Sequence, residues 1–207
     1  MQSPTASVPG WTTWAWRPRR RSFRPSGEFT NLSASTPKRL ENFAQPVCGC
    51  GVISRIALPI FKRHYAAVNG EQTTVYPHVV EGLQVMREKG LELACITNKA
   101  GDFTLPLLAR TGLAPYFRVV VSGDTTQEKK PHPAPLLYAC AQFGISPNEA
   151  VMIGDSTNDA LAGRNAGCQV LCVPYGYNEG GDVHDIDCDA IVDSLLDAAN
   201  MLRPSAS

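Results

Sequence analysis

The stretch from residue 150 to residue 167 reads AVMIGDSTNDALAGRNAG, and it decides the fold. Its first four residues are apolar and typical of a buried strand, while residues 157–166 have a helical pattern that ends at Gly167. A short polar turn that contains Asp155 joins the two. A carboxylate directly after a buried strand is costly without a partner, so Asp155 predicts a binding site at this strand end.

The same alternation of apolar strands and helices of about ten residues extends to both sides of this stretch. The expected strands are residues 91–97, 118–121, 150–153, 169–173 and 190–192. The expected helices are residues 77–89, a helix that ends near residue 111, and residues 133–143, 157–166 and 194–202. This order predicts an α/β fold with a doubly wound parallel sheet. In such sheets ligands bind at the carboxyl ends of the strands, so the polar residues there are the candidates.

Asp155 and Asp159 are the strongest pair of candidates, because one ends a strand and the other lies in the first turn of the next helix. Two carboxylates in this arrangement suit Mg²⁺, which prefers oxygen ligands. The structural alternative is that Ser156 or Thr157 caps the helix and Asp159 only favours its positive end. That alternative leaves Asp155 unexplained, so the pattern favours a metal site.

Two further strand ends carry chemistry that suits a phosphate group. Thr97 and Asn98 follow one strand, where a hydroxyl and backbone N–H groups can hold phosphate oxygens, although Thr-Asn is also a common cap. Lys129-Lys130-Pro131 precedes a helix, and a lysine there can neutralise phosphate as a point charge, although loop lysines are often simply exposed. The three strand ends together therefore predict a phosphate and Mg²⁺ site.

A threonine, a lysine before proline and a GDSxxD sequence, each after a parallel strand, resemble motifs two, three and four of the haloacid-dehalogenase-like hydrolases. Within that superfamily the chain is most similar to phosphoglycolate phosphatases. The resemblance covers about residues 58–202. It is supported by the stretches at residues 76–83, 96–99, 129–133 and 175–178.

The resemblance implies an Mg²⁺-dependent hydrolase that cleaves 2-phosphoglycolate, or another small phosphorylated metabolite, through an aspartyl-phosphate. It implies catalytic roles for Thr97 and Lys130, with Lys130 bridging nucleophile and phosphate. Thr97 and the backbone of Asn98 would hold the phosphate. Asp155 would bind Mg²⁺, and Asp159 would support the water shell of the metal.

The sequence departs from the family at its beginning. The family's first motif, DxDGT after the central strand, supplies the nucleophile and the acid/base aspartate, but the first aspartate of this chain is Asp102. We therefore expect residues 75–207 to form a core without its first strand, with an open position in the sheet. Residues 58–74 would be the remnant of a helical cap. We expect this chain to be inactive, or to be a relative that binds phosphate and Mg²⁺ without catalysis.

Residues 1–57 differ chemically from the rest, with eight basic residues against two acidic ones. They show no sustained period of 3.6 or 2 and predict an irregular segment. A displaced start of the chain is the favoured interpretation. A transit peptide over residues 1–45 and a basic arm for nucleic acid remain as alternatives.

Overall composition sets broader limits on function. The formal net charge of zero gives no reason to expect nucleic acid as a partner. No apolar run approaches the ~20 residues of a membrane span. The cysteines form no disulfide framework: Cys95, Cys140, Cys168 and Cys172 are expected in the core, and a lone Cys48-x-Cys50 is a poor metal site. A cytoplasmic location is expected, or an organelle if residues 1–45 are a transit peptide.

Overall fold

The structure is a computed structural model that describes residues 14–18, 60, 63, 69, 73–176, 178 and 181–203. The chain divides into two compact units, residues 1–26 with 70–207, and residues 27–69. The first unit contains the strand at residues 14–18 and every helix and strand between residues 79 and 201. The expected cap remnant at 58–74 and the Cys48-x-Cys50 pair lie almost wholly outside the described residues.

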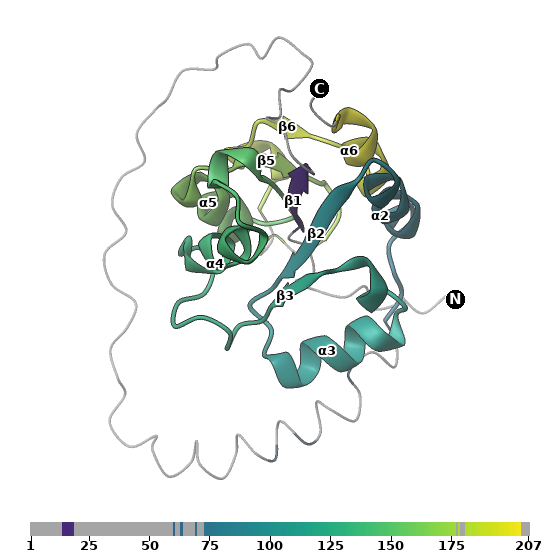
Figure 1. Cartoon of the computed structure of the whole chain (residues 1–207), viewed down its shortest axis with the longest axis vertical. Coiled ribbons are helices and arrows are strands. Elements are labelled where there is room, and N and C mark those ends of the chain that lie inside the picture. Colours follow the sequence, from purple (N-terminus) through teal and green to yellow (C-terminus); the bar gives the residue numbers. More distant parts are fainter. Residues whose placement is uncertain are drawn as a thin grey trace. The chain divides into compact units, whose positions relative to one another are not determined.

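Strands alternate with helices from residue 79 onward, as Figure 1 shows. The strands are β1 (Trp14–Pro18), β2 (Leu91–Ile96), β3 (Val119–Val121), β4 (Val151–Gly154), β5 (Gln169–Cys172) and β6 (Ala190–Ile191). The α-helices are α2 (Val79–Glu88), α3 (Gly101–Arg110), α4 (Ala134–Phe143), α5 (Thr157–Ala166) and α6 (Leu195–Met201). Short 3₁₀ turns are η1 (Ala114–Tyr116), η2 (Pro147–Glu149) and η3 (Val183–Asp185).

The strands form one sheet in the order β3-β2-β1-β4-β5-β6. Strands β2 and β3 pair in parallel, as do β4 with β5 and β5 with β6. Because β1 is antiparallel to both β2 and β4, those two strands run in the same direction. The predicted α/β fold with a doubly wound sheet is therefore confirmed, with β1 as the one reversed strand among the described residues.

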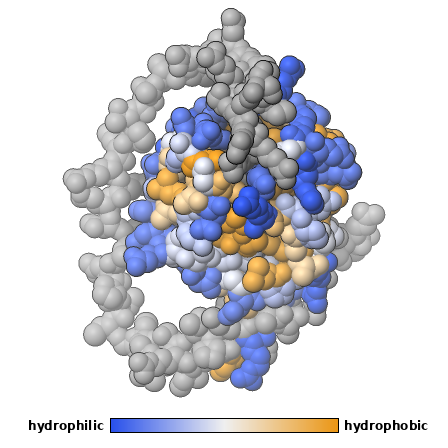
Figure 2. Space-filling model, viewed as in Figure 1, coloured by the Kyte–Doolittle hydropathy of each residue, from blue (hydrophilic) through white to orange (hydrophobic). Residues whose placement is uncertain are grey.

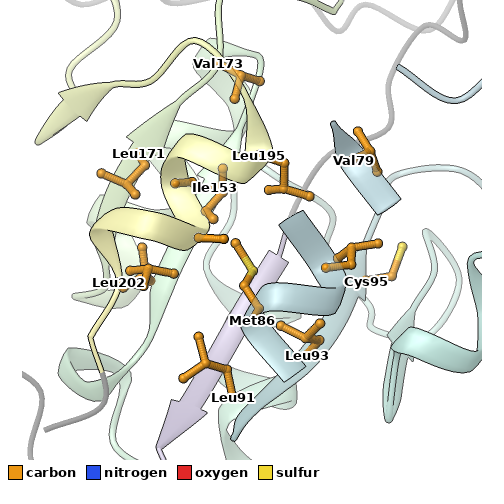
Figure 3. Packing of buried hydrophobic residues seen from close by; sticks show 14 of the residues in the cluster. Val79, Met86, Leu91, Leu93, Cys95, Ile153, Leu171, Val173, Leu195 and Leu202 are labelled. Carbon is orange, nitrogen blue, oxygen red and sulfur yellow. The ribbon is translucent and has the colours of Figure 1, made fainter. Parts of the chain in front are cut away.

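Alternate residues of β2, β4 and β5 pack into one of two hydrophobic layers, as the period of two in a strand requires. Odd-numbered residues of β2, β4 and β5 pack with α2 and α6, and Figure 3 shows Met86 and Leu195 among them. Even-numbered residues of the same strands pack with α4 and α5. Figure 1 shows these two pairs of helices on opposite faces of the sheet. Both faces of the sheet are thus covered, which explains the continuous apolar runs in the sequence.

Helix α2 begins later than the sequence suggested. Its N-cap is His78, with a φ of 63°, so Pro77 precedes the helix instead of forming its first turn. Helix α5 begins as expected, with Ser156 as its N-cap, and ends at Gly167 with a φ of 83°. A left-handed residue at the helix end is the usual reason for glycine at this position.

The central position of the sheet is not open, which corrects one expectation. Trp14 to Pro18 form β1 and fill the place between β2 and β4, with five residues paired to β2 and Trp14 also paired to Ile153. The expectation of an irregular segment is therefore wrong at these residues. The physical reason is that the inner edges of β2 and β4 carry backbone groups that need partners. The rest of the predicted domain division stays a prediction.

Deleting residues 1–18 removes β1 and tests this arrangement. We expect the free energy of unfolding to fall by about 3 kcal/mol or more, because several ladder hydrogen bonds worth roughly 1 kcal/mol each are lost. Urea denaturation measures the loss, and amide exchange should become faster in Leu91–Ile96. Deletion of residues 204–207 is the control, since it removes none of the described elements. Equal stability of the two truncated chains would contradict the assignment of β1.

The surface is mixed in character. Figure 2 shows hydrophilic residues around the margin of one face and hydrophobic ones toward its middle. Large apolar side chains that remain exposed include Leu105, Leu137 and Leu161, which come from three different helices. Among the residues described, no helix combines the length and the apolar character needed to cross a lipid bilayer.

The cysteines expected in the core are buried, which confirms that expectation for Cys95, Cys140, Cys168 and Cys172. Burial raises the pKa of Cys95 to about 12, and nearby Lys130 opposes this only in part. Cys188 is half-buried, and a hydrogen bond with the Cys172 thiol lowers its pKa, with Arg164 assisting and burial opposing. Thiolate is the reactive form of cysteine, so the two sites should differ in reactivity.

Alkylation with iodoacetamide at about pH 7.5 tests this difference. This pH lies below the ordinary pKa of a thiol, so a cysteine with a lowered pKa has a larger thiolate fraction than the others. We expect Cys188 to be modified first among the described cysteines and Cys95 to react only after denaturation. Peptide mass spectrometry at successive times measures the order. Labelling in denaturant provides the control for intrinsic reactivity. Modification of Cys95 as fast as Cys188 in the native protein would contradict the burial pattern.

Candidate active site

The carboxyl ends of β2, β3, β4 and β5 lie along the same edge of the sheet, since these strands share one direction. Thr97 follows β2 directly and Asp155 follows β4 directly. The segment with Lys130 leads from β3 to α4, and Asp159 lies in the first turn of α5. The fold therefore brings the predicted polar strand ends to a common edge, where parallel sheets bind ligands.

Lys130 is buried at this edge and contacts both β2 and α5. It is only 7% exposed, and its Nζ lies 2.7 Å from Oδ1 of Asp159. The same Nζ donates to the carbonyl of Ile96, at 2.9 Å. The neighbouring Lys129 is exposed. A buried ammonium needs a charged or hydrogen-bonded partner, so this geometry distinguishes Lys130 from Lys129 as the structured lysine.

The side chain of Asn98 holds the backbone of Lys130. Its Oδ1 accepts from the Lys130 N–H at 3.0 Å, and its Nδ2 donates to the Lys130 carbonyl at 2.8 Å. This double hydrogen bond fixes one peptide segment against the end of β2. The sequence suggested a phosphate contact through the Asn98 backbone, and it gave no sign of this positioning role for the side chain.

Asp159 connects the start of α5 to the end of β4. Its Oδ2 accepts from the Ser156 hydroxyl at 2.9 Å and from the Asp155 N–H at 3.2 Å. Gly154 permits this approach, because a Cβ there would overlap the Asp159 side chain. Both carboxylate oxygens of Asp159 thus contact protein donors, one of which is the Lys130 ammonium. The predicted support of a metal's water shell by Asp159 stays a prediction.

Thr97 is buried at the end of β2, with 6% exposure. Its N–H donates to the Val121 carbonyl at 2.8 Å, which continues the pairing between β2 and β3. Its Oγ1 accepts from the N–H of Lys99 at 3.2 Å. These contacts hold the hydroxyl within the turn that follows the strand, where backbone N–H groups can form a concave anion site.

Asp155 is 5% exposed, and its carboxylate influences two neighbouring groups. The pKa of Tyr175 is raised, chiefly by burial, with a contribution from Asp155. The pKa of Cys172 is raised by its hydrogen bond with Cys188 and by burial, with smaller contributions from Asp159 and Asp155. The carboxylates that follow β4 therefore act on groups at the carboxyl end of β5.

The donor set fits Mg²⁺ in part. Mg²⁺ is commonly held by one or two carboxylates together with waters and substrate phosphate oxygens. Asp155 fits as one such carboxylate because it is buried at the strand end. Within the described part of the chain, no three His, Cys, Asp or Glu residues gather into a group that could hold a metal ion. The remaining oxygen ligands would have to come from phosphate and water.

A sequence profile of the family described as Haloacid dehalogenase-like hydrolase matches residues 39–173. This match extends over more than half of the chain and includes Thr97, Asn98, Lys130, Asp155 and Asp159. The chain therefore belongs to the haloacid dehalogenase-like hydrolases, and the resemblance seen in the sequence is confirmed.

The similar curated proteins are phosphoglycolate phosphatases. The protein of that name from Nitrosospira multiformis is 52% identical over 73% of this chain and 67% of its own length. The one from Thiobacillus denitrificans is 51% identical over 70% of this chain and 64% of its own length. A crystal structure of a predicted phosphoglycolate phosphatase from Haemophilus somnus has a TM-score of 0.65 at 35% identity, covering 69% of this chain and 65% of that one. The chain thus spans about two thirds of these relatives.

Replacing Asp159 by Asn tests the buried ion pair. We expect the free energy of unfolding to fall by about 3 kcal/mol, because the variant removes the carboxylate from a buried ammonium. Chemical denaturation measures this loss.

The matched control is Asp187→Asn. Asp187 forms an ion pair with Arg164, and its side chain is 79% exposed. Exposed pairs contribute little, so this variant should lose less than about 1 kcal/mol. Comparable losses in the two variants would contradict a special role for the Lys130–Asp159 pair.

Proposed function

We propose that the edge with Thr97, Lys130 and Asp155 binds the phosphate group of a small phosphorylated metabolite together with Mg²⁺. The observation that carries this proposal is the position of the Lys130 Nζ, which contacts both the end of β2 and Asp159 on α5. The buried Lys130 ammonium thereby links the turn at Thr97, which is proposed to hold phosphate oxygens, to the carboxylates that follow β4. Phosphoryl transfer depends on this kind of positioning and charge stabilisation.

Each residue has a defined part in the proposed site. Thr97 and the backbone of Asn98 contact phosphate oxygens, and Lys130 offsets the charge of the phosphate. Asp155 holds Mg²⁺, which when bound offsets the negative charge on the phosphoryl oxygens. Asp159 holds Lys130, and its influence on the metal would act through water. The same Asn98 that contacts phosphate through its backbone fixes Lys130 through its side chain.

The proposed substrate class is 2-phosphoglycolate or a similar small phosphate monoester. The relatives at about 50% identity carry the name phosphoglycolate phosphatase, which favours this substrate over others in the family. Family hydrolysis through an aspartyl-phosphate needs an aspartate directly after the first strand, and this sequence has no aspartate before Asp102. We therefore propose that this polypeptide by itself binds phosphate and Mg²⁺ but does not hydrolyse the ester.

Thermal unfolding with ligands, combined with an activity assay, tests the proposal. We expect inorganic phosphate with Mg²⁺ to raise the melting temperature, since a ligand that binds only the native state stabilises it. Asp155→Asn should abolish the Mg²⁺-dependent part, and Lys130→Met should abolish the phosphate-dependent part. With 2-phosphoglycolate and Mg²⁺, the unmodified chain should release no phosphate above background.

Two results would contradict the proposal in different ways. The absence of any stabilisation by phosphate and Mg²⁺ would remove the binding function. Release of phosphate that disappears in the Asp155→Asn variant would support the binding site but overturn the proposed inactivity. The Asp187→Asn variant is the control in each assay, because its carboxylate belongs to the exposed Arg164 pair.

A further inference from the structure

The loop after β5 approaches Asp155 more closely than any side chain would permit. Gly176 has a φ of 124°, and a Cβ built there would overlap Oδ2 of Asp155. Two separate constraints therefore require glycine here, the backbone conformation and the space. The consequence is that the Gly176 backbone packs directly against one oxygen of the Asp155 carboxylate.

Two side chains hold this loop in place on either side of Gly176. Before it, the Tyr175 hydroxyl accepts from the Leu195 N–H at 3.1 Å, and its ring centroid lies 4.8 Å from that of Tyr76. After it, Oδ1 of Asn178 accepts from the N–H of Thr157 at 3.2 Å and from its hydroxyl at 3.3 Å. The loop is thus tied to the starts of α6 and α5.

The hydrogen bonds between Thr157 and Asn178 lie in the same helical turn as Asp159. Thr157 is the first residue of α5, and Asp159 two residues later contacts Lys130 at 2.7 Å. Asn178 satisfies one of the backbone N–H groups that a helix start leaves without an intrahelical partner. One loop therefore contacts the Asp155 carboxylate and also holds the helix turn that positions the lysine.

We infer that Gly176 and Asn178 are positioning residues that fix the Asp155 carboxylate for Mg²⁺ binding. This inference rests on the proposed metal role of Asp155. Groups that orient a metal ligand commonly change metal affinity by 10–100-fold when they are altered. Gly176 sets the place of one carboxylate oxygen, and Asn178 keeps the loop and the start of α5 together.

Binding of Mn²⁺ to the full chain, followed by the electron paramagnetic resonance signal of the free ion, tests this inference. Mn²⁺ suits the same oxygen ligands as Mg²⁺. For Gly176→Ala we expect affinity to fall about tenfold or more, because the new methyl group displaces the carboxylate. Gly112→Ala is the matched control, since Gly112 also has a positive φ of 72° but open space around its Cβ position. It should lose stability and keep its Mn²⁺ affinity.

Variants of Asn178 separate positioning from a general effect on folding. Asn178→Ala removes the acceptor for Thr157 and should weaken Mn²⁺ binding about tenfold, at the lower end of effects on supporting groups. Asn178→Asp keeps an acceptor oxygen and adds a charge that a helix start favours, so it should retain at least the parent affinity. Melting temperatures of all variants show whether affinity changes follow stability.

The outcomes distinguish this inference from the proposed function. Asp155→Asn serves as the reference variant. If it leaves Mn²⁺ affinity unchanged, the metal role of Asp155 fails and the inference fails with it. If it abolishes binding while Gly176→Ala binds as tightly as Gly112→Ala, the positioning role alone is overturned. Loss of affinity in Gly176→Ala and Asn178→Ala, with recovery in Asn178→Asp, supports it.

Discussion

The buried ammonium of Lys130 is the constraint on which the arrangement of the site depends. Removing a charge from water is expensive, and the cost is offset only by good geometry and additional hydrogen bonds. Here the ammonium contacts the carboxylate of Asp159 and the carbonyl of Ile96. Because one partner belongs to α5 and the other to β2, the ion pair couples elements that are separated in sequence by more than fifty residues. The start of α5 is therefore held against the sheet.

Around this ion pair, the contacts between the candidate site residues involve backbone groups as well as side chains. Asn98 holds the peptide groups of Lys130, and Oδ2 of Asp159 accepts the Asp155 N–H. Gly154 and Gly176 lie where neighbouring carboxylates leave no space for a Cβ. These contacts hold the polar groups of the site in defined positions relative to one another, which is what preorganisation requires.

The sequence predicted most of the fold because both faces of the sheet are covered. Strands buried on two sides read as apolar runs, and glycines such as Gly167 mark where helices end. The positions of Thr97 and Asp155 directly after strands, and of Lys130 between a strand and a helix, were also predictable, because these residues stand beside regular apolar patterns in the sequence. Strand β1 was not predictable, since its five residues show no sustained pattern and the pairing depends on partners far along the chain. The roles of the Asn98 side chain, Gly176 and Asn178 depend on contacts between loops, which local patterns do not encode.

The reversed direction of β1 determines which of its ends lies near the candidate site residues. Trp14 pairs with Cys95 near the edge that carries Lys130, whereas Pro18 pairs with Leu91 at the opposite edge. The four steps between these five residues, at about 3.3 Å each, separate Trp14 from Pro18 by roughly 13 Å. The carboxyl end of β1 therefore lies at the end of the sheet opposite to Thr97 and Asp155. Strand β1 thus differs in polarity from β2 and β4, whose carboxyl ends carry Thr97 and Asp155.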